Sequence, residues 1–123
     1  MKVVFLMSAF NPCQWYRMWQ PASKLPGAEL VLHPGGYLPR ALDLAAAADL
    51  VQMSYVCQEH ELAAMRELRR RGVPVCVDYD DNLFRMTGSI EREGVMEACR
   101  LANAIVVPTA GLGATYSRIA PKT

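Results

Sequence analysis

The sequence predicts an α/β protein, a three-layer Rossmann-like domain with a parallel sheet of about five strands and helices on both faces. Short apolar runs rich in β-branched residues alternate along the chain with stretches of helical periodicity. Successive runs lie too far apart for hairpins, so each connection is expected to be a crossover helix. The runs are apolar throughout, which is typical of strands buried on both faces.

Composition is consistent with one globular domain over residues 1–123, since 52% of the residues are apolar and 20% are charged. The net charge of +1 gives no general attraction to nucleic acid or to an anionic membrane. The N-terminal apolar run, Val3 to Met7, is too short for a signal sequence or a membrane span. Four cysteines without the spacing of a zinc site favour a reducing, cytoplasmic location.

The first half of the chain is predicted to contain three strands and the helices between them. Trp15 and Trp19, four residues apart, would share one face of a helix that begins after Pro12. Pro21 disfavours a helix interior, so we expect a break near Gln20 and a new segment from Pro21. The other expected elements are strands at 29–33 and 49–53, a turn at 34–36 and a helix at 38–48.

The second half continues the alternation. The helix expected over 59–71 has its inner stripe at Leu62, Met65 and Leu68 and stops at Gly72. A buried strand from Val73 leads into a cluster of carboxylates. The remaining expected elements are a loop at 86–89, a helix from Ser89 to about 102, a strand at 104–107 and a helix capped by Thr109 that runs to about 119.

An acidic cluster follows the strand that begins at Val73. Asp78, Asp80 and Asp81 lie within four residues, and Asn82 comes next. Three like charges so close resist ionising together, so they require donors, a cation or open solvent. Because ligands of open α/β sheets bind where strands end, the cluster is a candidate site. Alternatively, Asp80, Asp81 and Asn82 cap the next segment in an exposed turn.

Polar and aromatic residues also follow the first strand, at the same predicted edge of the sheet. They are Asn11, Gln14, Tyr16 and Arg17. Together with the acidic cluster, such groups suit a hydroxyl-rich ligand, with Arg17 holding a carboxylate or phosphate. Two further interpretations are compatible with this one: Trp15 and Trp19 belong to the core, and Arg17 forms a salt bridge with Asp80 or Asp81.

Glycine-rich phosphate-binding loops are missing where they would be expected, because neither GxGxxG nor GxxxxGK[ST] follows the first strand. The Asp-x-Asp sequence itself admits two enzyme chemistries. In phosphatases of the haloacid-dehalogenase type, Asp78 would be the nucleophile and Asp80 the acid/base, with Mg²⁺. In type-A glycosyltransferases, such carboxylates hold a divalent ion on a nucleotide sugar. A non-enzymatic α/β module that binds another protein is a third alternative.

Three segments, in order, resemble the N-terminal Rossmann-like domain of type-B glycosyltransferases, in particular the family 4-like enzymes. Tyr16-Arg17, with Pro21 and Leu25, is similar to their Tyr-Arg-x-x-x-Pro-x-x-x-Leu segment. Residues 62–84 resemble their helix, glycine, apolar strand and Asp-x-Asp-Asp sequence. Residues 100–109 resemble their Arg-x-Ala-x-Ala-Ile-x-Val-x-Thr strand entering a helix.

This resemblance implies the acceptor-side half of a sugar transferase. The partners would be a sugar or glycosylated acceptor and a C-terminal domain that is missing here, with no nucleic acid. That missing domain would bind the nucleotide-sugar donor, so this chain is expected to hold no cofactor or metal and to be inactive alone. Asp78, Asp80 and Asp81 would shape the cleft or orient an acceptor hydroxyl. A general-base role for Asp78 or Asp80 is left open.

Overall fold

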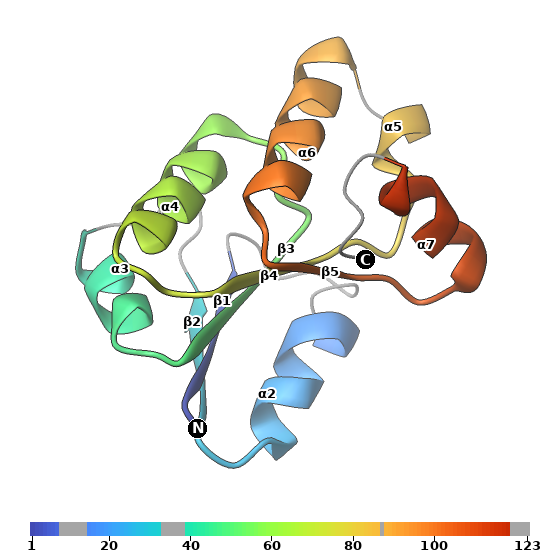
Figure 1. Ribbon diagram of the computed structural model, residues 1–123. Helices are drawn as coiled ribbons and strands as arrows, with labels where there is room; N and C mark the ends of the chain where they lie inside the picture. Colours follow the sequence, from blue (N-terminus) through green and yellow to red (C-terminus); the bar gives the residue numbers. More distant parts are fainter. Residues whose placement is uncertain (8–14, 33–38, 87, 119–123) are drawn as a thin grey trace.

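The computed structural model describes residues 1–7, 15–32, 39–86 and 88–118. Its centre is one parallel five-stranded sheet with the order β2-β1-β3-β4-β5 (Figure 1). The strands are β1 (Val3–Met7), β2 (Ala28–Leu32), β3 (Leu50–Ser54), β4 (Val75–Asp78) and β5 (Ala104–Val106). The predicted Rossmann-like α/β class is therefore confirmed, and each predicted strand is present to within a few residues.

Helical segments connect the strands and lie on both faces of the sheet. They are η1 (Trp15–Trp19), α2 (Gln20–Lys24), α3 (Pro39–Ala46), α4 (Glu59–Arg70), α5 (Leu83–Met86), α6 (Ser89–Leu101) and α7 (Ala110–Ser117). α2 lies on one face of the sheet, whereas α3, α4 and α6 lie on the other (Figure 1). Among the described helices, none is both long enough and apolar enough to cross a bilayer.

The alternating side chains of β1 divide the core into two clusters. Val4 and Leu6 belong to the larger cluster, beneath α3, α4, α6 and α7. Val3, Phe5 and Met7 face the other way and pack with Met18 and Ala22, which lie on η1 and α2. The buried residues of this smaller cluster are Val3, Phe5, Met7, Met18 and Ala22. All five residues of β1 are buried, as expected for a central parallel strand.

Local signals in the sequence explain where the longer helices begin and end. The backbone N–H of Gln58 donates to Glu61 Oε1 at 3.1 Å, which is half of a capping box before α4. α4 ends before Gly72, whose φ of +80° is a conformation that favours glycine. The side chain of Thr109 accepts a hydrogen bond from the N–H of Leu112, so the predicted cap of α7 is confirmed.

The segment predicted to begin at Pro21 is present as α2, which begins at Gln20. The expected break near Gln20 is a change of helical geometry, because the π-helix η1 continues directly into α2. Pro21 stands in the first turn of α2, where its missing N–H costs least. Residues Leu83–Met86, partly expected as loop, form the short helix α5. The turn predicted at 34–36 lies outside the described residues.

One half of the sheet is covered on a single face. The register aligns Phe5 of β1 with Gln52 of β3, Cys76 of β4 and Ala104 of β5, so these side chains share the face that carries α2. Phe5 is buried beneath η1 and α2, but Gln52, Cys76 and Ala104 are only partly buried. Val106, on the same face of β5, is 40% exposed. Within the described residues, the α2 face of β4 and β5 is thus only partly covered.

Candidate functional site

A paired arginine and aspartate join η1 to the end of β4. Arg17 Nε donates to Asp78 Oδ2 at 2.8 Å, and Arg17 Nη2 donates to Asp78 Oδ1. The side chain of Asp78 is 2% exposed and that of Arg17 is 26% exposed. The hydrogen bond with Asp78 raises the pKa of Arg17, against the opposing effect of burial. Two parallel charge-assisted hydrogen bonds hold the guanidinium in one orientation.

This pair corrects one prediction. Arg17 was expected to bridge Asp80 or Asp81, but its carboxylate partner is Asp78. Its expected role in holding a ligand's carboxylate or phosphate stays a prediction, with Nε and Nη2 bound to Asp78. As predicted, the Tyr16-Arg17 segment and the acidic cluster nevertheless lie side by side at one edge of the sheet.

The tryptophans of η1 do not form the core. Trp15 and Trp19 are each 38% exposed, and their rings stack on one another with centroids 5.7 Å apart. The alternative that both belong to the core is therefore wrong, although the two do share one side of the helix as their spacing predicts. Met18, between them in the sequence, is the fully buried residue of η1.

Two stacked tyrosines fix the turn that carries the remaining carboxylates. Tyr79 and Tyr116 are buried, with ring centroids 4.9 Å apart and planes 7° apart. The Tyr79 hydroxyl donates to the carbonyl oxygen of Val56 at 2.6 Å. The Tyr116 hydroxyl donates to the carbonyl oxygen of Asp81 at 2.8 Å. The backbone of the acidic turn is therefore anchored to both α7 and the segment after β3.

Replacing Tyr79 with phenylalanine is expected to destabilise the protein by about 1–2 kcal/mol, because the buried carbonyl of Val56 would lose its donor. Urea unfolding followed by circular dichroism measures this cost. Tyr16→Phe is the matched control, since the Tyr16 side chain is exposed and its loss of a hydroxyl should leave the unfolding midpoint unchanged. Equal midpoints for Tyr79→Phe and wild type would contradict the buried hydrogen bond.

Tyr55 approaches the same turn from β3. Its φ of +54° is in the left-handed region, where a residue with a bulky side chain is strained. Its backbone N–H donates to the Asp78 carbonyl oxygen at 3.1 Å, and its hydroxyl donates to Asp81 Oδ2 at 3.1 Å. The strained conformation thus lets one residue contact both ends of the acidic turn.

Asp80 and Asn82 keep oxygen atoms without a described donor. Asp80 Oδ1 and Asn82 Oδ1 are buried, and neither accepts a hydrogen bond from the described residues. Burial, followed by the nearby charge of Asp81, raises the pKa of Asp80, while the charge of Arg17 opposes this shift. Asp80 is therefore a carboxylate whose surroundings favour its protonated form, with one oxygen that accepts no hydrogen bond from the described residues.

The raised pKa of Asp80 predicts the direction in which the stability of the fold changes with pH. A carboxyl group whose pKa is higher in the folded state stabilises that state below its unfolded pKa, and this stabilisation is lost as pH rises through the folded pKa. Asp80→Asn is therefore expected to be stabilising at pH 7, by under about 1 kcal/mol because the residue is partly exposed. Thermal unfolding at pH 7 and at pH 3.5 measures it. A benefit larger at pH 3.5 than at pH 7 would contradict this sign.

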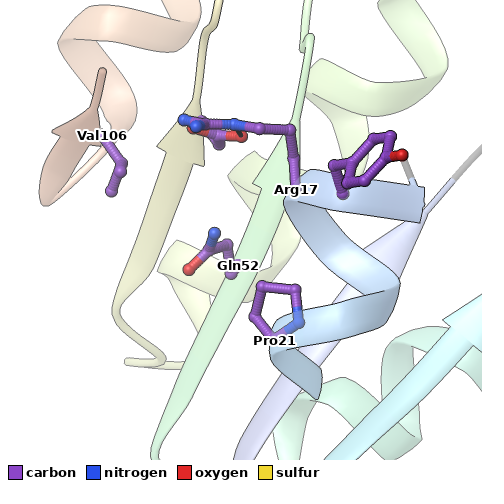
Figure 2. Close-up of a pocket in the computed structure, with 6 residues that line it drawn as sticks. Arg17, Pro21, Gln52 and Val106 are labelled. Atoms are coloured by element: carbon purple, nitrogen blue, oxygen red, sulfur yellow. Dashed lines mark hydrogen bonds and ion pairs between the residues drawn. The ribbon is translucent and has the colours of Figure 1, made fainter. Parts of the chain in front are cut away.

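A shallow pocket of about 210 Å³ lies beside the Arg17–Asp78 pair, on the open α2 face of the sheet. Figure 2 shows its residues, which come from η1, α2, β3, β4 and β5. The pocket is lined by Tyr16, Arg17, Pro21, Gln52, Asp78 and Val106. Three of these were predicted site residues. Gln52, Pro21 and Val106 were not, although the alternation of β3 could have placed Gln52 on the face opposite the buried Val51 and Met53.

The other predicted site residues divide by position. Asp81 is exposed on the acidic turn, and Asn82 follows it partly buried; neither lines the pocket. Asn11 and Gln14 lie outside the described residues. Within the described part of the chain, no three metal-binding side chains are grouped around a common point. What the structure brings together is Tyr16, Arg17 and Asp78.

Comparisons with known proteins add little about identity. No protein-family model matches the chain, and no curated protein matches it. A solved structure described as a conserved protein from Enterococcus faecalis V583 is similar over 97% of each chain, with 13% sequence identity and a TM-score of 0.46. A similarity of that strength supports no argument about function.

The sheet itself therefore defines the class of protein. The molecule is a Rossmann-like α/β domain in which all strands are parallel and the strand order reverses between β1 and β3. Such folds bind ligands outside the carboxyl ends of the strands near that reversal. The acidic turn follows β4 at this edge, and the Arg17–Asp78 pair stands beside it.

Proposed function

We propose that this chain is the acceptor-side domain of a type-B, family 4-like glycosyltransferase, in which a sugar passes from a nucleotide-sugar donor to an acceptor. The observation that supports the proposal most is the pairing of Arg17 with Asp78. It joins two of the three segments whose sequences resemble that family, and it does so beside a pocket at the ligand-binding edge of the sheet.

The carboxylates take different roles in this proposal. Asp78 is buried and both its oxygens bind Arg17, so it positions η1 rather than reacting. Asp80 has an oxygen without a described donor and a raised pKa, which suits a base that accepts the proton of an acceptor hydroxyl. The acceptor oxygen would bond to the anomeric carbon as the bond from that carbon to the nucleotide breaks.

The proposal assigns the rest of the reaction to a second domain. That domain would bind the nucleotide sugar, and this chain by itself would bind an acceptor without transferring sugar to it. A cytoplasmic location is part of the same proposal, and free thiols at Cys57, Cys76 and Cys99 are compatible with it.

The phosphatase alternative is less compatible with the geometry. An aspartate nucleophile must present a free oxygen to phosphorus, but both oxygens of Asp78 accept hydrogen bonds from Arg17 in a nearly inaccessible position. We therefore expect no hydrolysis of p-nitrophenyl phosphate in the presence of Mg²⁺. Hydrolysis that is abolished by Asp78→Asn would reverse the order of the two proposals.

Binding measurements on this chain test the transferase proposal. Saturation-transfer NMR is recorded with a panel of oligosaccharides, with nucleotide sugars, and with the corresponding free nucleotides. We expect transfer to oligosaccharide protons and none to nucleotide base protons. Asp80→Asn should preserve oligosaccharide binding, because a base acts on the hydroxyl proton during transfer and contributes little to ground-state affinity.

The opposite pattern would exclude the acceptor role. Nucleotide binding without any oligosaccharide binding would place this chain on the donor side. Binding of neither class, in a sample shown to be folded by its dispersed NMR spectrum, would favour the non-enzymatic module that binds another protein.

A further inference from the structure

The pocket beside Arg17 exists because one helix covers only part of the sheet. Met18 and Ala22 of η1 and α2 pack over β1, while the open side of the same helix presents Arg17 and Pro21. Facing them across the open strands are Gln52 and Val106, as Figure 2 shows. Drug-sized ligands occupy roughly 300–1,000 Å³. A space of about 210 Å³ therefore suits one small ring.

Charge at the pocket favours an uncharged occupant. Its charged lining residues are Arg17 and Asp78, and each is the partner of the other. A ligand anion would meet a guanidinium whose charge Asp78 already balances, and an anion that took Nε or Nη2 from Asp78 would leave a buried carboxylate without those donors. A ligand cation would compete for Asp78 in the same way. A neutral ligand avoids both costs.

The remaining lining supplies two kinds of contact. The side-chain amide of Gln52 has both a donor and an acceptor, and it stands between Pro21 and Val106 in Figure 2. Tyr16, Pro21 and Val106 supply apolar surface around it, and Tyr16 as a residue is 67% exposed. A polar group surrounded by apolar surface matches a ring that has hydroxyl groups at its edge and C–H groups on its faces.

We propose that this pocket binds one neutral pyranose ring of the acceptor, with the Gln52 amide hydrogen-bonded to its hydroxyls and Pro21 and Val106 against its C–H surface. This inference rests on the proposed transferase function and narrows it to an uncharged terminal sugar. Gln52 is then a specificity-determining residue supplied by β3.

Methyl glycosides of glucose, galactose, mannose and N-acetylglucosamine are the neutral probes, and glucuronate and inorganic phosphate are the anionic ones. Each is titrated into ¹⁵N-labelled protein while the side-chain amide signals are followed. We expect one or more methyl glycosides to shift the Gln52 amide signals, and the anions to leave them in place. Gln52→Leu keeps a similar shape and should weaken that binding about tenfold by removing the polar contacts.

Gln20→Leu is the matched control, because Gln20 lies on α2 but does not line the pocket. It should leave glycoside affinity unchanged. If glycosides bind with equal affinity to wild type and Gln52→Leu, the pocket assignment fails while an acceptor role elsewhere survives. If no glycoside binds but longer oligosaccharides do, a single-ring pocket is again excluded without loss of the transferase proposal.

Two further outcomes would overturn the inference. Tighter binding of glucuronate or phosphate than of the methyl glycosides would contradict a neutral ligand. A dimer in sedimentation velocity that dissociates in Val106→Asp, but not in Leu44→Asp on α3, would show that a second copy of the chain covers the pocket. Val106 and Leu44 are hydrophobic residues of similar exposure, so the two variants differ mainly in where on the molecule the charge is introduced.

Discussion

Gly94→Ala is expected to destabilise the domain by about 3 kcal/mol, or to prevent its folding. A Cβ atom at Gly94 of α6 would lie 1.9 Å from the carbonyl oxygen of Cys57 and 3.2 Å from its Cα. Both are backbone atoms in the segment that leads into α4, so no side chain can rotate away. The helices would have to separate, with loss of core packing. Urea unfolding at equilibrium measures the effect.

Gly111→Ala gives the matched comparison. Gly111 lies on α7, and an added Cβ there would meet no atom within 4 Å. Alanine is the better helix former, so this variant should be as stable as wild type or more stable by up to about 1 kcal/mol. If Gly94→Ala unfolded at the same urea concentration as Gly111→Ala, the close approach of α6 to Cys57 would be disproved.

Arg17→Met is expected to cost about 3 kcal/mol. The substitution keeps an apolar stem but removes both donors from Asp78, whose side chain is 2% exposed, and so leaves a buried carboxylate unpaired. This loss of stability is at the lower end of the range for breaking a buried ion pair, because the Arg17 side chain is 26% exposed. Arg92→Met, at an exposed position on α6, should change stability by less than about 0.5 kcal/mol.

A double variant separates loss of the pair from loss of packing. Combining Arg17→Met with Asp78→Leu removes both charges, and we expect it to be more stable than Arg17→Met alone, since an apolar pair leaves no buried charge behind. The four unfolding free energies form a double-mutant cycle, which isolates the interaction between the two side chains. A coupling energy near zero would mean that Asp78 does not depend on Arg17.

The strands could be predicted closely because each is a short apolar run between clear helix signals. Val3–Met7 was predicted with its observed bounds, and α4 was recognised from its inner stripe and from Gly72. The segment at Pro21 was predicted to within one residue, but the π geometry before it was not, because sequence rules assume α geometry on both sides of a proline. Here a π-turn precedes it, and Pro21 falls in the first turn of the α-helix.

The sequence predicted which segments form the site but not which side chains contact one another. Strand alternation places Asp78 on the same face as Cys76 and Gln52, which is the face that carries η1. Asp80 lies beyond the end of β4, in the turn, where alternation no longer fixes its direction. Which face η1 would cover depends on the path of the first crossover, and that is a property of the whole chain. The partner of Arg17 therefore required the structure.

The open half of the sheet also bears on how the domain fluctuates. β5 has three residues, pairs with β4 alone in the described sheet, and has one face uncovered; β1 lies between two strands with both faces buried. In hydrogen–deuterium exchange, the amides of β5 should therefore lose protection through local opening well before those of β1, which should exchange only on global unfolding. A bound ligand or partner on that face would slow exchange in β5 first.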